Sequence, residues 1–219
     1  DREILTQRVA GAGEIAAYGW VPPVAGYTGQ QPEWANWTQA ERNARAQALY
    51  AEAGFSADNP LRVEVLYNTN ENHKRMSVAI ASMWKQVLGV ETSLLNQEWK
   101  VFLETRNQKS DTQVFRAGWI ADYNDAYSFA QLMHSKNEQN DSGYVNADYD
   151  ALLDQAAVEQ DPAVRAGYLE AAEQVLLTDL PIMPVYFYVS KHLVKPRVQG
   201  FVPNIMDHHP TRQLSLNGN

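Results

Sequence analysis

The sequence predicts an α/β fold in which a mostly parallel or mixed sheet is flanked by helices. The middle of the chain alternates strand and helix patterns, from a strand over 61–67 to a strand over 113–119. Strands joined in this way need crossover connections, whose helices cover the sheet. The chain has 219 residues, of which 45% are hydrophobic, so it is long enough to bury the core of such a fold.

The N-terminal part predicts a helix, a long loop and a second helix. Residues 1–10 have helical character that ends at Gly11-Ala12-Gly13. Thr38 and Glu41 have the spacing of a capping box, so a helix is expected through Glu52, ending at Gly54. Between these helices, residues 18–37 carry several Gly and Pro residues and predict an ordered loop anchored by aromatic side chains: Trp20, Tyr27, Trp34 and Trp37.

The central part supplies the sheet. Residues 61–67 and 90–95 are rich in Val and Leu and predict strands, as does the short apolar run 113–119. A short helix is expected over 99–106. Another follows the polar turn 68–72 and ends at Gly89, with an apolar face of Met76, Ala79, Ile80, Met83, Trp84 and Val87. Ligands of parallel sheets bind beyond the carboxyl ends of the strands. The segments after Tyr67 and Trp119 are therefore predicted to contact a ligand.

The C-terminal part is helical and then irregular. Helical character over 125–133 and a polar loop over 134–146 precede a helix over 147–159. Asp161 is a predicted N-cap with Pro162 at the first helical position, in a helix that reaches about Thr178. Residues 182–189 are rich in β-formers, but Pro184 makes this an edge or irregular strand. The tail 190–219 predicts loops with short strands.

Composition narrows the function classes. A net charge of −8 argues against nucleic acid as the main partner, because phosphate binding needs clustered Lys and Arg. The absence of Cys excludes disulfides, thiolate zinc sites and cysteine nucleophiles. No apolar run reaches the roughly 18 residues of a membrane-spanning helix. The chain opens as the interior of a helix would, which favours a piece of a longer chain.

Several motifs fail in their context. Residues 11–16 match a dinucleotide fingerprint, but Pro22-Pro23 prevents the helix that must follow. Residues 122–127 begin like a calcium loop that no Glu closes. The tail histidines (His192, His208, His209) lack a carboxylate or helical spacing and are interpreted as solvated or locally hydrogen-bonded, so no metal site is predicted. No serine-nucleophile elbow, His-Glu-x-x-His motif or phosphate loop occurs, so neither an enzyme nor a cofactor is indicated.

The segment from Val114 to Asn124 carries the remaining chemistry. Arg116 lies within an apolar strand and Asp122 follows six residues on, a reach of roughly 20 Å when extended. One interpretation is structural, with the arginine paired to a nearby acid and the aspartate starting a turn. The other is a groove with opposite charges at its two ends, which suits the ammonium and carboxylate of a short peptide.

Arg116-Ala-Gly-Trp-Ile-Ala-Asp-Tyr-Asn124 resembles the signature of the bacterial extracytoplasmic solute-binding proteins of oligopeptide, dipeptide and nickel ABC importers (family 5). Supporting matches lie at 66–69 with 73–74, at 96–100, and at 184–189 with 193–196. Within the family the motifs are most similar to the oligopeptide and murein-peptide receptors. Members of this type are more than twice as long, so the resemblance covers their C-terminal portion.

The resemblance implies one lobe of a two-lobed, type II-like periplasmic binding protein that captures short peptides in its cleft. Residues 1–186 would form an α/β ligand-binding lobe, and 187–219 a crossing segment and tail returning to a missing N-terminal lobe. The implied partners are short peptides, that lobe and the membrane permease of the importer, with the Gram-negative periplasm as the compartment. Residues 204–219 match nothing in the family pattern.

The resemblance also assigns site residues. Asp122 would hold the peptide ammonium, and Arg116 or His73 the carboxylate, depending on peptide length. Gly118 and Ile120 would offer backbone groups, and the pocket walls would be Trp99, Arg106, Trp119 and Tyr188. Without the resemblance, His73 is better interpreted as a solvent-facing residue at a helix N-terminus. The alternative weighed for Trp99 and Tyr188 is that they are ordinary core residues.

Two other functions stay open. A receptor of the same superfamily for nickel, haem or a sugar is disfavoured, because a lone carboxylate at Asp122 suits an α-ammonium. A peptide hydrolase is disfavoured because no nucleophile, metal or base motif is found in the sequence.

Overall fold

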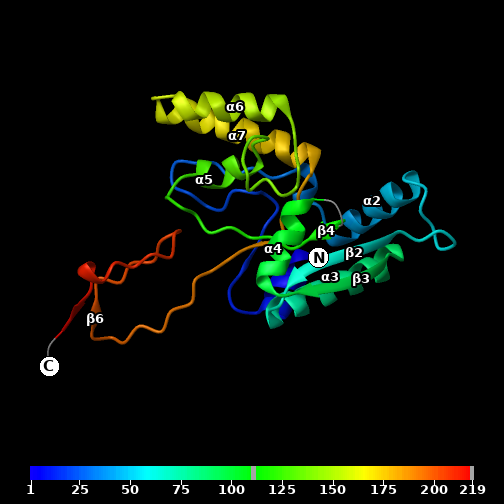
Figure 1. The fold of residues 1–219 in the computed structure, drawn as a ribbon, viewed down its shortest axis with the longest axis horizontal. Helices are drawn as coiled ribbons and strands as arrows, with labels where there is room; N and C mark the ends of the chain where they lie inside the picture. Colours follow the sequence, from blue (N-terminus) through cyan, green and yellow to red (C-terminus); the bar gives the residue numbers. More distant parts are fainter. Residues whose placement is uncertain (110–111, 218–219) are drawn as a thin grey trace.

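The computed structural model describes residues 1–109 and 112–217 and has an α/β fold. Its main sheet has three parallel strands in the order β3-β2-β4, formed by Glu91–Gln97, Arg62–Asn68 and Val114–Phe115. Helix α3 (Glu71–Leu88) connects β2 to β3, and α4 (Trp99–Gln108) follows β3, as crossover connections require (Figure 1). The parallel sheet flanked by helices is confirmed.

Local capping sets the helix bounds. Helix α2 (Gln39–Glu52) begins with both hydrogen bonds of the capping box between Thr38 and Glu41. The Asn70 side chain caps α3, which ends at Gly89 in the left-handed conformation with φ +78°. Asp161 caps α7 (Pro162–Asp179) by accepting from two backbone N–H groups of its first turn. Each of these ends follows from side chains next to it in the sequence.

The N-terminal residues form a helix and a strand that joins a distant part of the chain. Helix α1 (Arg2–Ile4) continues as the π-helix η1 (Leu5–Ala10), which ends at Gly11 with φ +67°. Strand β1 (Ile15–Ala16), which the sequence analysis did not predict, pairs antiparallel with β5 (Tyr186–Phe187). This pairing places the segment that follows α7 beside the N-terminal residues.

Two strands are shorter than predicted. Instead of 113–119, β4 covers only Val114–Phe115, because after one more hydrogen bond, from the Arg116 N–H to the Leu66 carbonyl (2.8 Å), the backbone leaves the sheet. Instead of 182–189, β5 covers only Tyr186–Phe187. Pro184, which has no N–H to donate, precedes β5, as the edge-strand interpretation expects.

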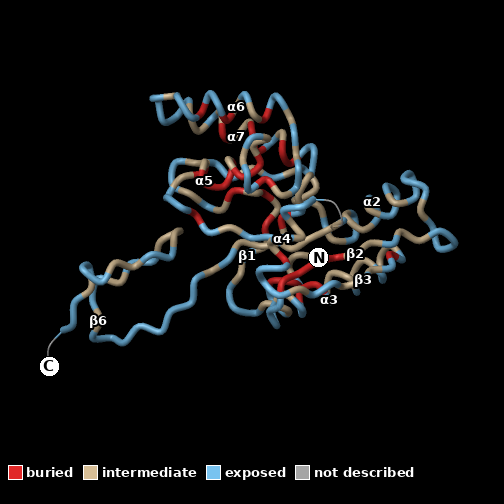
Figure 2. The backbone as a smooth tube through the Cα atoms, viewed as in Figure 1, coloured by how far each residue is buried: buried red, intermediate tan, exposed pale blue. Residues whose placement is uncertain are grey.

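A helical layer holds the hydrophobic core cluster. It comprises α5 (Tyr127–Ala130), the 3₁₀ turn η3 (Gln131–Met133), α6 (Ala147–Val158) and α7. Figure 2 shows the buried positions on the facing sides of these helices and along β2. Fully buried side chains of α6 and α7 form the centre of the cluster: Tyr149, Leu153, Ala156, Ala172 and Leu176.

A buried carboxylate fastens the long aromatic loop to this layer. Glu173 of α7 is 1% exposed and accepts hydrogen bonds from the N–H groups of Trp20 (2.5 Å) and Val21 (2.8 Å) and from the Tyr27 hydroxyl. Burial raises the pKa of Glu173. The loop contains the 3₁₀ turn η2 (Glu33–Asn36), and two of the predicted aromatic anchors, Trp20 and Tyr27, make hydrogen bonds to the helical layer.

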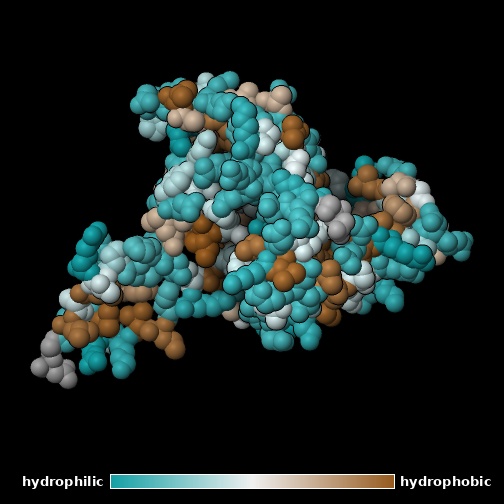
Figure 3. All heavy atoms as spheres, viewed as in Figure 1, coloured by the Kyte–Doolittle hydropathy of each residue, from teal (hydrophilic) through white to brown (hydrophobic). Residues whose placement is uncertain are grey.

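The tail extends from the body as an arm, drawn orange to red in Figure 1. Strand β6 (Val198–Gln199) pairs antiparallel with β7 (Ser215–Leu216), and η4 (Thr211–Gln213) precedes β7. Apolar side chains lie exposed along the arm (brown in Figure 3), whereas Ile205 and Met206 pack against the core of the helical layer. Within the described ranges, no helix is long and apolar enough to cross a membrane.

Candidate functional site

Buried polar side-chain atoms without a protein partner gather near the carboxyl edge of the main sheet. Apart from Arg106 Nε, which is paired with Asp141 Oδ2, five such atoms occur among the described residues, and one of them belongs to Thr92. The others lie at strand ends or on the segments that follow the strands: Asn68 Oδ1, Gln97 Oε1, His73 Nδ1 and Trp119 Nε1. Because leaving a buried polar atom unpaired costs about 1–3 kcal/mol, such a concentration indicates a site that binds something polar.

Arg116, Gly118 and Tyr188 meet at the β4 side of this edge. Arg116 Nη2 donates to the Tyr188 hydroxyl, and the guanidinium carbon lies 5.7 Å from the centroid of the tyrosine ring. A Cβ atom at Gly118 would lie 2.9 Å from Arg116 Nη2 and 3.0 Å from Tyr188 Cε2. The contact therefore depends on glycine at this position. Burial lowers the pKa of Arg116, and the positive charge of Arg106 acts in the same direction.

His73 lies close enough to Arg116 for the arginine charge to affect the pKa of the histidine. The histidine stands in the first turn of α3, where the Asn70 side chain accepts its backbone N–H. Burial lowers the pKa of His73, and the positive charge of Arg116 lowers it further. Its half-buried ring differs from the solvent-facing residue expected without the family resemblance. An anion bound between His73 and Arg116 would relieve this repulsion.

The pocket-wall candidates have different surroundings. Trp99 and Tyr188 are each 48% exposed, so neither is the core residue that one interpretation expected. Trp99 stacks on Phe102 with ring centroids 5.8 Å apart. Trp119 instead packs against the core cluster of the helical layer.

Arg106 is held in place by an acid and an aromatic ring. Its Nε lies 2.5 Å from Asp141 Oδ2, and its guanidinium carbon lies 5.4 Å from the Phe102 ring centroid. Arg106 is therefore a fixed positive charge on α4.

Asp122 and Ile120 lie on the exposed segment that leads from β4 to α5. Ile120 is 61% exposed, and Asp122 is also exposed, while the Asp122 N–H donates to Ser128 Oγ (2.9 Å). The structural interpretation of the motif expected an acid beside Arg116. In the described part of the chain the hydrogen-bond partner of the Arg116 guanidinium is instead the Tyr188 hydroxyl.

The acid that forms an ion pair is Asp125, which directly follows this motif. Both of its oxygens accept from Arg165 of α7, at 2.8 and 2.9 Å. The sequence analysis missed this pair, because nothing in the sequence next to either residue indicates it. The structure thus brings Arg116, Gly118, Tyr188 and His73 together and leaves the Asp122 side chain free for solvent.

Comparison with known proteins agrees with the family resemblance of the sequence motifs. Residues 1–141 match the family described as bacterial extracellular solute-binding proteins, family 5 Middle. The chain is 42% identical over 218 residues to the periplasmic oligopeptide-binding protein OppA of Escherichia coli, covering 99% of this chain and 40% of that protein. It is 40% identical to the periplasmic murein peptide-binding protein MppA of the same organism, covering 92% and 38%.

A further relative and a solved structure extend the comparison. The probable deoxycholate-binding periplasmic protein YgiS of Escherichia coli is 35% identical, covering 99% of this chain and 40% of that protein. The structure of Haemophilus influenzae OppA in complex with RPPGFSPFR superposes with a TM-score of 0.89 at 37% identity, covering 99% and 43%. The chain spans about 40% of the length of the curated relatives it matches.

Proposed function

Because the chain belongs to the bacterial extracellular solute-binding proteins of family 5, we propose that it forms one ligand-binding lobe of a periplasmic peptide receptor of an ABC importer. The relatives named for oligopeptides and murein peptides support this ligand class, and their names describe binding proteins rather than enzymes. The observation that carries the proposal is a half-buried arginine, Arg116, whose partner in the described chain is a neutral hydroxyl.

Arg116 and His73 bind the carboxylate end of the peptide. A guanidinium has five N–H donors, and contact with the Tyr188 hydroxyl leaves the others for the two oxygens of a carboxylate. The unpartnered Nδ1 of His73 supplies a further polar contact. An anion here also offsets the positive charges of Arg106 and Arg116, which lie close enough for Arg106 to lower the pKa of Arg116.

The extended segment 116–122 binds the peptide backbone and its ammonium end. Beyond the Arg116 N–H, which still donates to the Leu66 carbonyl, the backbone groups are no longer part of the sheet, so those of Gly118 and Ile120 are offered to an added peptide strand. The exposed Asp122 carboxylate then accepts the α-ammonium. Backbone pairing is independent of peptide sequence, as a general peptide receptor requires.

The walls tolerate varied side chains. Trp99 and Tyr188 present half-exposed aromatic faces, and Trp119 Nε1 adds a polar atom without a protein hydrogen-bond partner. The Arg106 guanidinium, paired with Asp141, adds a fixed charge. Such a mixture of apolar faces and polar atoms, filled by water where the ligand side chain is small, demands no single shape.

We propose a division of the chain into a lobe, residues 1–186, and a crossing segment and tail, residues 187–219. The apolar side chains exposed on the arm, among them Leu193, Val202 and Leu216, would pack against a second lobe of the kind that the longer relatives have room for. The importer permease is the proposed membrane partner, and the periplasm the proposed compartment.

Calorimetry on the mature protein that contains this chain tests the assignment, with a free tripeptide, its N-acetyl form and its C-terminal amide. Asp122→Asn should cost at least about 2 kcal/mol of binding free energy for the free peptide, the scale for truncating one partner of a charge pair. The acetylated peptide should bind poorly to the wild type, and the Asp122→Asn change should weaken its binding little further. Asp58→Asn, at an exposed acid elsewhere, is the matched control. Equal losses for free and acetylated peptides would refute the role of Asp122.

The relative named for deoxycholate favours a second candidate, a non-peptide carboxylic acid. Such a ligand would use Arg116 but has no ammonium for Asp122. Native mass spectrometry of the protein as purified separates the two: co-purified peptides support the peptide receptor, and a bound acid without peptides supports the alternative.

A further inference from the structure

The tail brings together two histidines and an aspartate, none of which belongs to the proposed peptide site. His192 Nε2 lies 2.7 Å and His209 Nε2 lies 3.2 Å from the same oxygen, Asp207 Oδ1. One ligand atom from each residue lies within 4.8 Å of the others. The sequence analysis found no carboxylate spaced to serve the tail histidines, whereas the fold places Asp207 between two of them.

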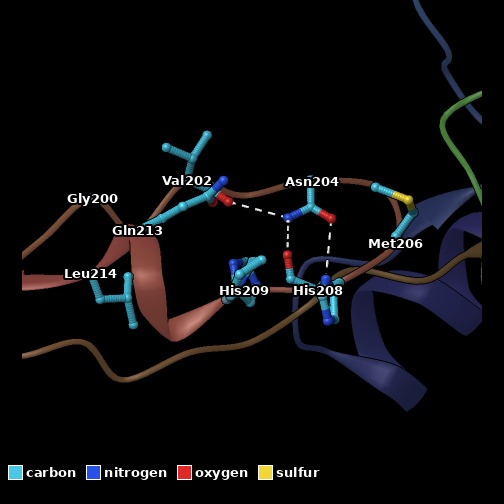
Figure 4. Close-up of a pocket in the computed structure, with 9 residues that line it drawn as sticks. Gly200, Val202, Asn204, Met206, His208, His209, Gln213 and Leu214 are labelled. Atoms are coloured by element: carbon cyan, nitrogen blue, oxygen red, sulfur yellow. Dashed lines mark hydrogen bonds between the residues drawn. The ribbon is translucent and has the colours of Figure 1, made fainter.

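Hydrogen bonds of Asn204 fix the loop around Asp207 without using the side chains of His192 and His209. Asn204 Nδ2 donates to the carbonyls of His208 (2.9 Å) and Val202 (3.3 Å), and Asn204 Oδ1 accepts the His208 N–H (3.2 Å), as Figure 4 shows. The Asp207 N–H in turn donates to the Asn204 carbonyl (3.1 Å). Asp207 has φ +52°, a left-handed conformation that costs an aspartate free energy and that this network sustains.

Aromatic packing orients the two imidazoles. The His209 ring stacks on Phe201 with centroids 4.1 Å apart and an interplanar angle of 25°, and the His192 ring lies 5.0 Å from the same phenylalanine. The two histidine rings meet edge to face at 5.0 Å. His192, Phe201 and Asp207 also line a hollow of about 240 Å³, which leaves space beside the cluster.

The donor set fits a particular class of ion. Two imidazole nitrogens and one carboxylate oxygen suit borderline divalent transition metals, zinc above all. With bonds of about 2.0–2.2 Å in tetrahedral geometry, the ligand atoms around zinc stand about 3.3 Å apart. The observed separations from the Asp207 oxygen are 2.7 and 3.2 Å, so an adjustment of less than an ångström at these two contacts admits the ion.

We propose that His192, Asp207 and His209 bind a divalent transition-metal ion of the zinc class through His192 Nε2, His209 Nε2 and Asp207 Oδ1. Each imidazole binds in its neutral form, with its proton on Nδ1, because the Nε2 lone pair is the ligand. Three protein ligands leave a fourth position, on the side of the hollow, for water or an outside donor. This site is separate from the proposed peptide site and does not depend on it.

The test uses the mature protein that contains this chain, after treatment with a chelator and dialysis. Titration with ZnCl₂ against a chromogenic chelator should show one high-affinity zinc per chain. His192→Ala, Asp207→Asn and His209→Ala should each weaken this binding by at least about tenfold. His208→Ala is the control, because His208 is an exposed histidine of the same loop outside the cluster. Circular dichroism checks that each variant is folded.

Cobalt gives an independent measurement of the geometry. Co²⁺ should produce visible d–d absorption typical of tetrahedral nitrogen and oxygen ligation, and Asp207→Asn should abolish it while keeping the size of the side chain. Two results would overturn the proposal. One is the absence of stoichiometric zinc binding, which would leave the histidines as hydrogen-bond partners of Asp207. The other is zinc binding that His208→Ala weakens as much as the changes at the three ligands.

Discussion

Gly118→Ala tests whether the contact between Arg116 and Tyr188 positions the guanidinium for a ligand. The added Cβ would lie 2.9 Å from Arg116 Nη2, and contact becomes ordinary only at 3.4 Å, so the guanidinium or its neighbour must move by about half an ångström. Both close neighbours are the far ends of flexible side chains, and Tyr188 is half exposed. The unfolding free energy should therefore fall by only about 1 kcal/mol, the low end for overpacking.

Peptide binding should suffer more than folding in this variant. A displaced guanidinium loses the alignment of its charge-assisted hydrogen bonds to the peptide carboxylate, which are worth about 1.5–3 kcal/mol each. We expect affinity for a free tripeptide to fall by about tenfold, since a 1.4 kcal/mol change corresponds to that factor. A C-terminally amidated peptide, which lacks the carboxylate, should lose little beyond its already weaker binding.

The assay is calorimetry with both peptides, together with chemical denaturation of each protein. Gly29→Ala is the matched control, because a Cβ there meets nothing within 4 Å. If Gly118→Ala behaves like Gly29→Ala in both measurements, the packing argument is wrong. If free and amidated peptides lose affinity equally, Arg116 does not meet the carboxylate.

Two further predictions concern stability. Glu173→Ala leaves the buried N–H of Val21 and the Tyr27 hydroxyl without their acceptor, so denaturation should show a loss of about 3 kcal/mol. Because burial raises the folded-state pKa of Glu173, its ionisation destabilises the fold, and the stability of the wild type relative to Glu173→Gln should fall as pH rises through that pKa; a pH-independent difference would contradict this. Arg165→Ala removes the partly exposed bidentate pair with Asp125 and should cost about 1 kcal/mol in thermal denaturation, with Arg165→Lys in between; an unchanged melting temperature would count against the pair.

Most of the helices could be predicted because their ends are set by neighbouring residues. The capping box at Thr38, the glycine at 89 and the Asp161-Pro162 pair each act within one turn, so the sequence pattern contains the cause. Strand β2 was predictable for a related reason, because polar and apolar residues alternate from Arg62 to Val65 and Val and Leu are frequent. Strand β3 shows a weaker form of this pattern, with Leu94 and Leu95 after Val90.

The features that were missed depend on contacts between distant residues. Strand β1 has two residues, Ile15 and Ala16, and exists because Phe187 and Tyr186 lie opposite. The buried Glu173 also has no local signal, because its donors come from a loop far away in the chain. Such features become visible only after the helical layer has assembled.

The candidate site shows the same limit at the level of single residues. The motif around Arg116 and Asp122 indicated two charges, but not that the arginine meets a tyrosine hydroxyl or that the neighbouring Asp125 forms the ion pair with Arg165. Tyr188 reaches Arg116 because β5 is held beside β1, which no local pattern predicts.

The third strand was predicted to be longer than it is, and this difference is relevant to the proposed peptide binding. β4 is the edge strand of the sheet, and had it continued to Trp119 the backbone groups on the side facing β2 would have been used in pairing. Pairing ends at Phe115, apart from the one hydrogen bond from the Arg116 N–H to Leu66, and the residues that follow keep their backbone donors and acceptors for another strand. An added peptide strand needs unpaired edges of this kind. The apolar run that predicts a longer strand is thus completed, in this proposal, by the ligand rather than by the protein.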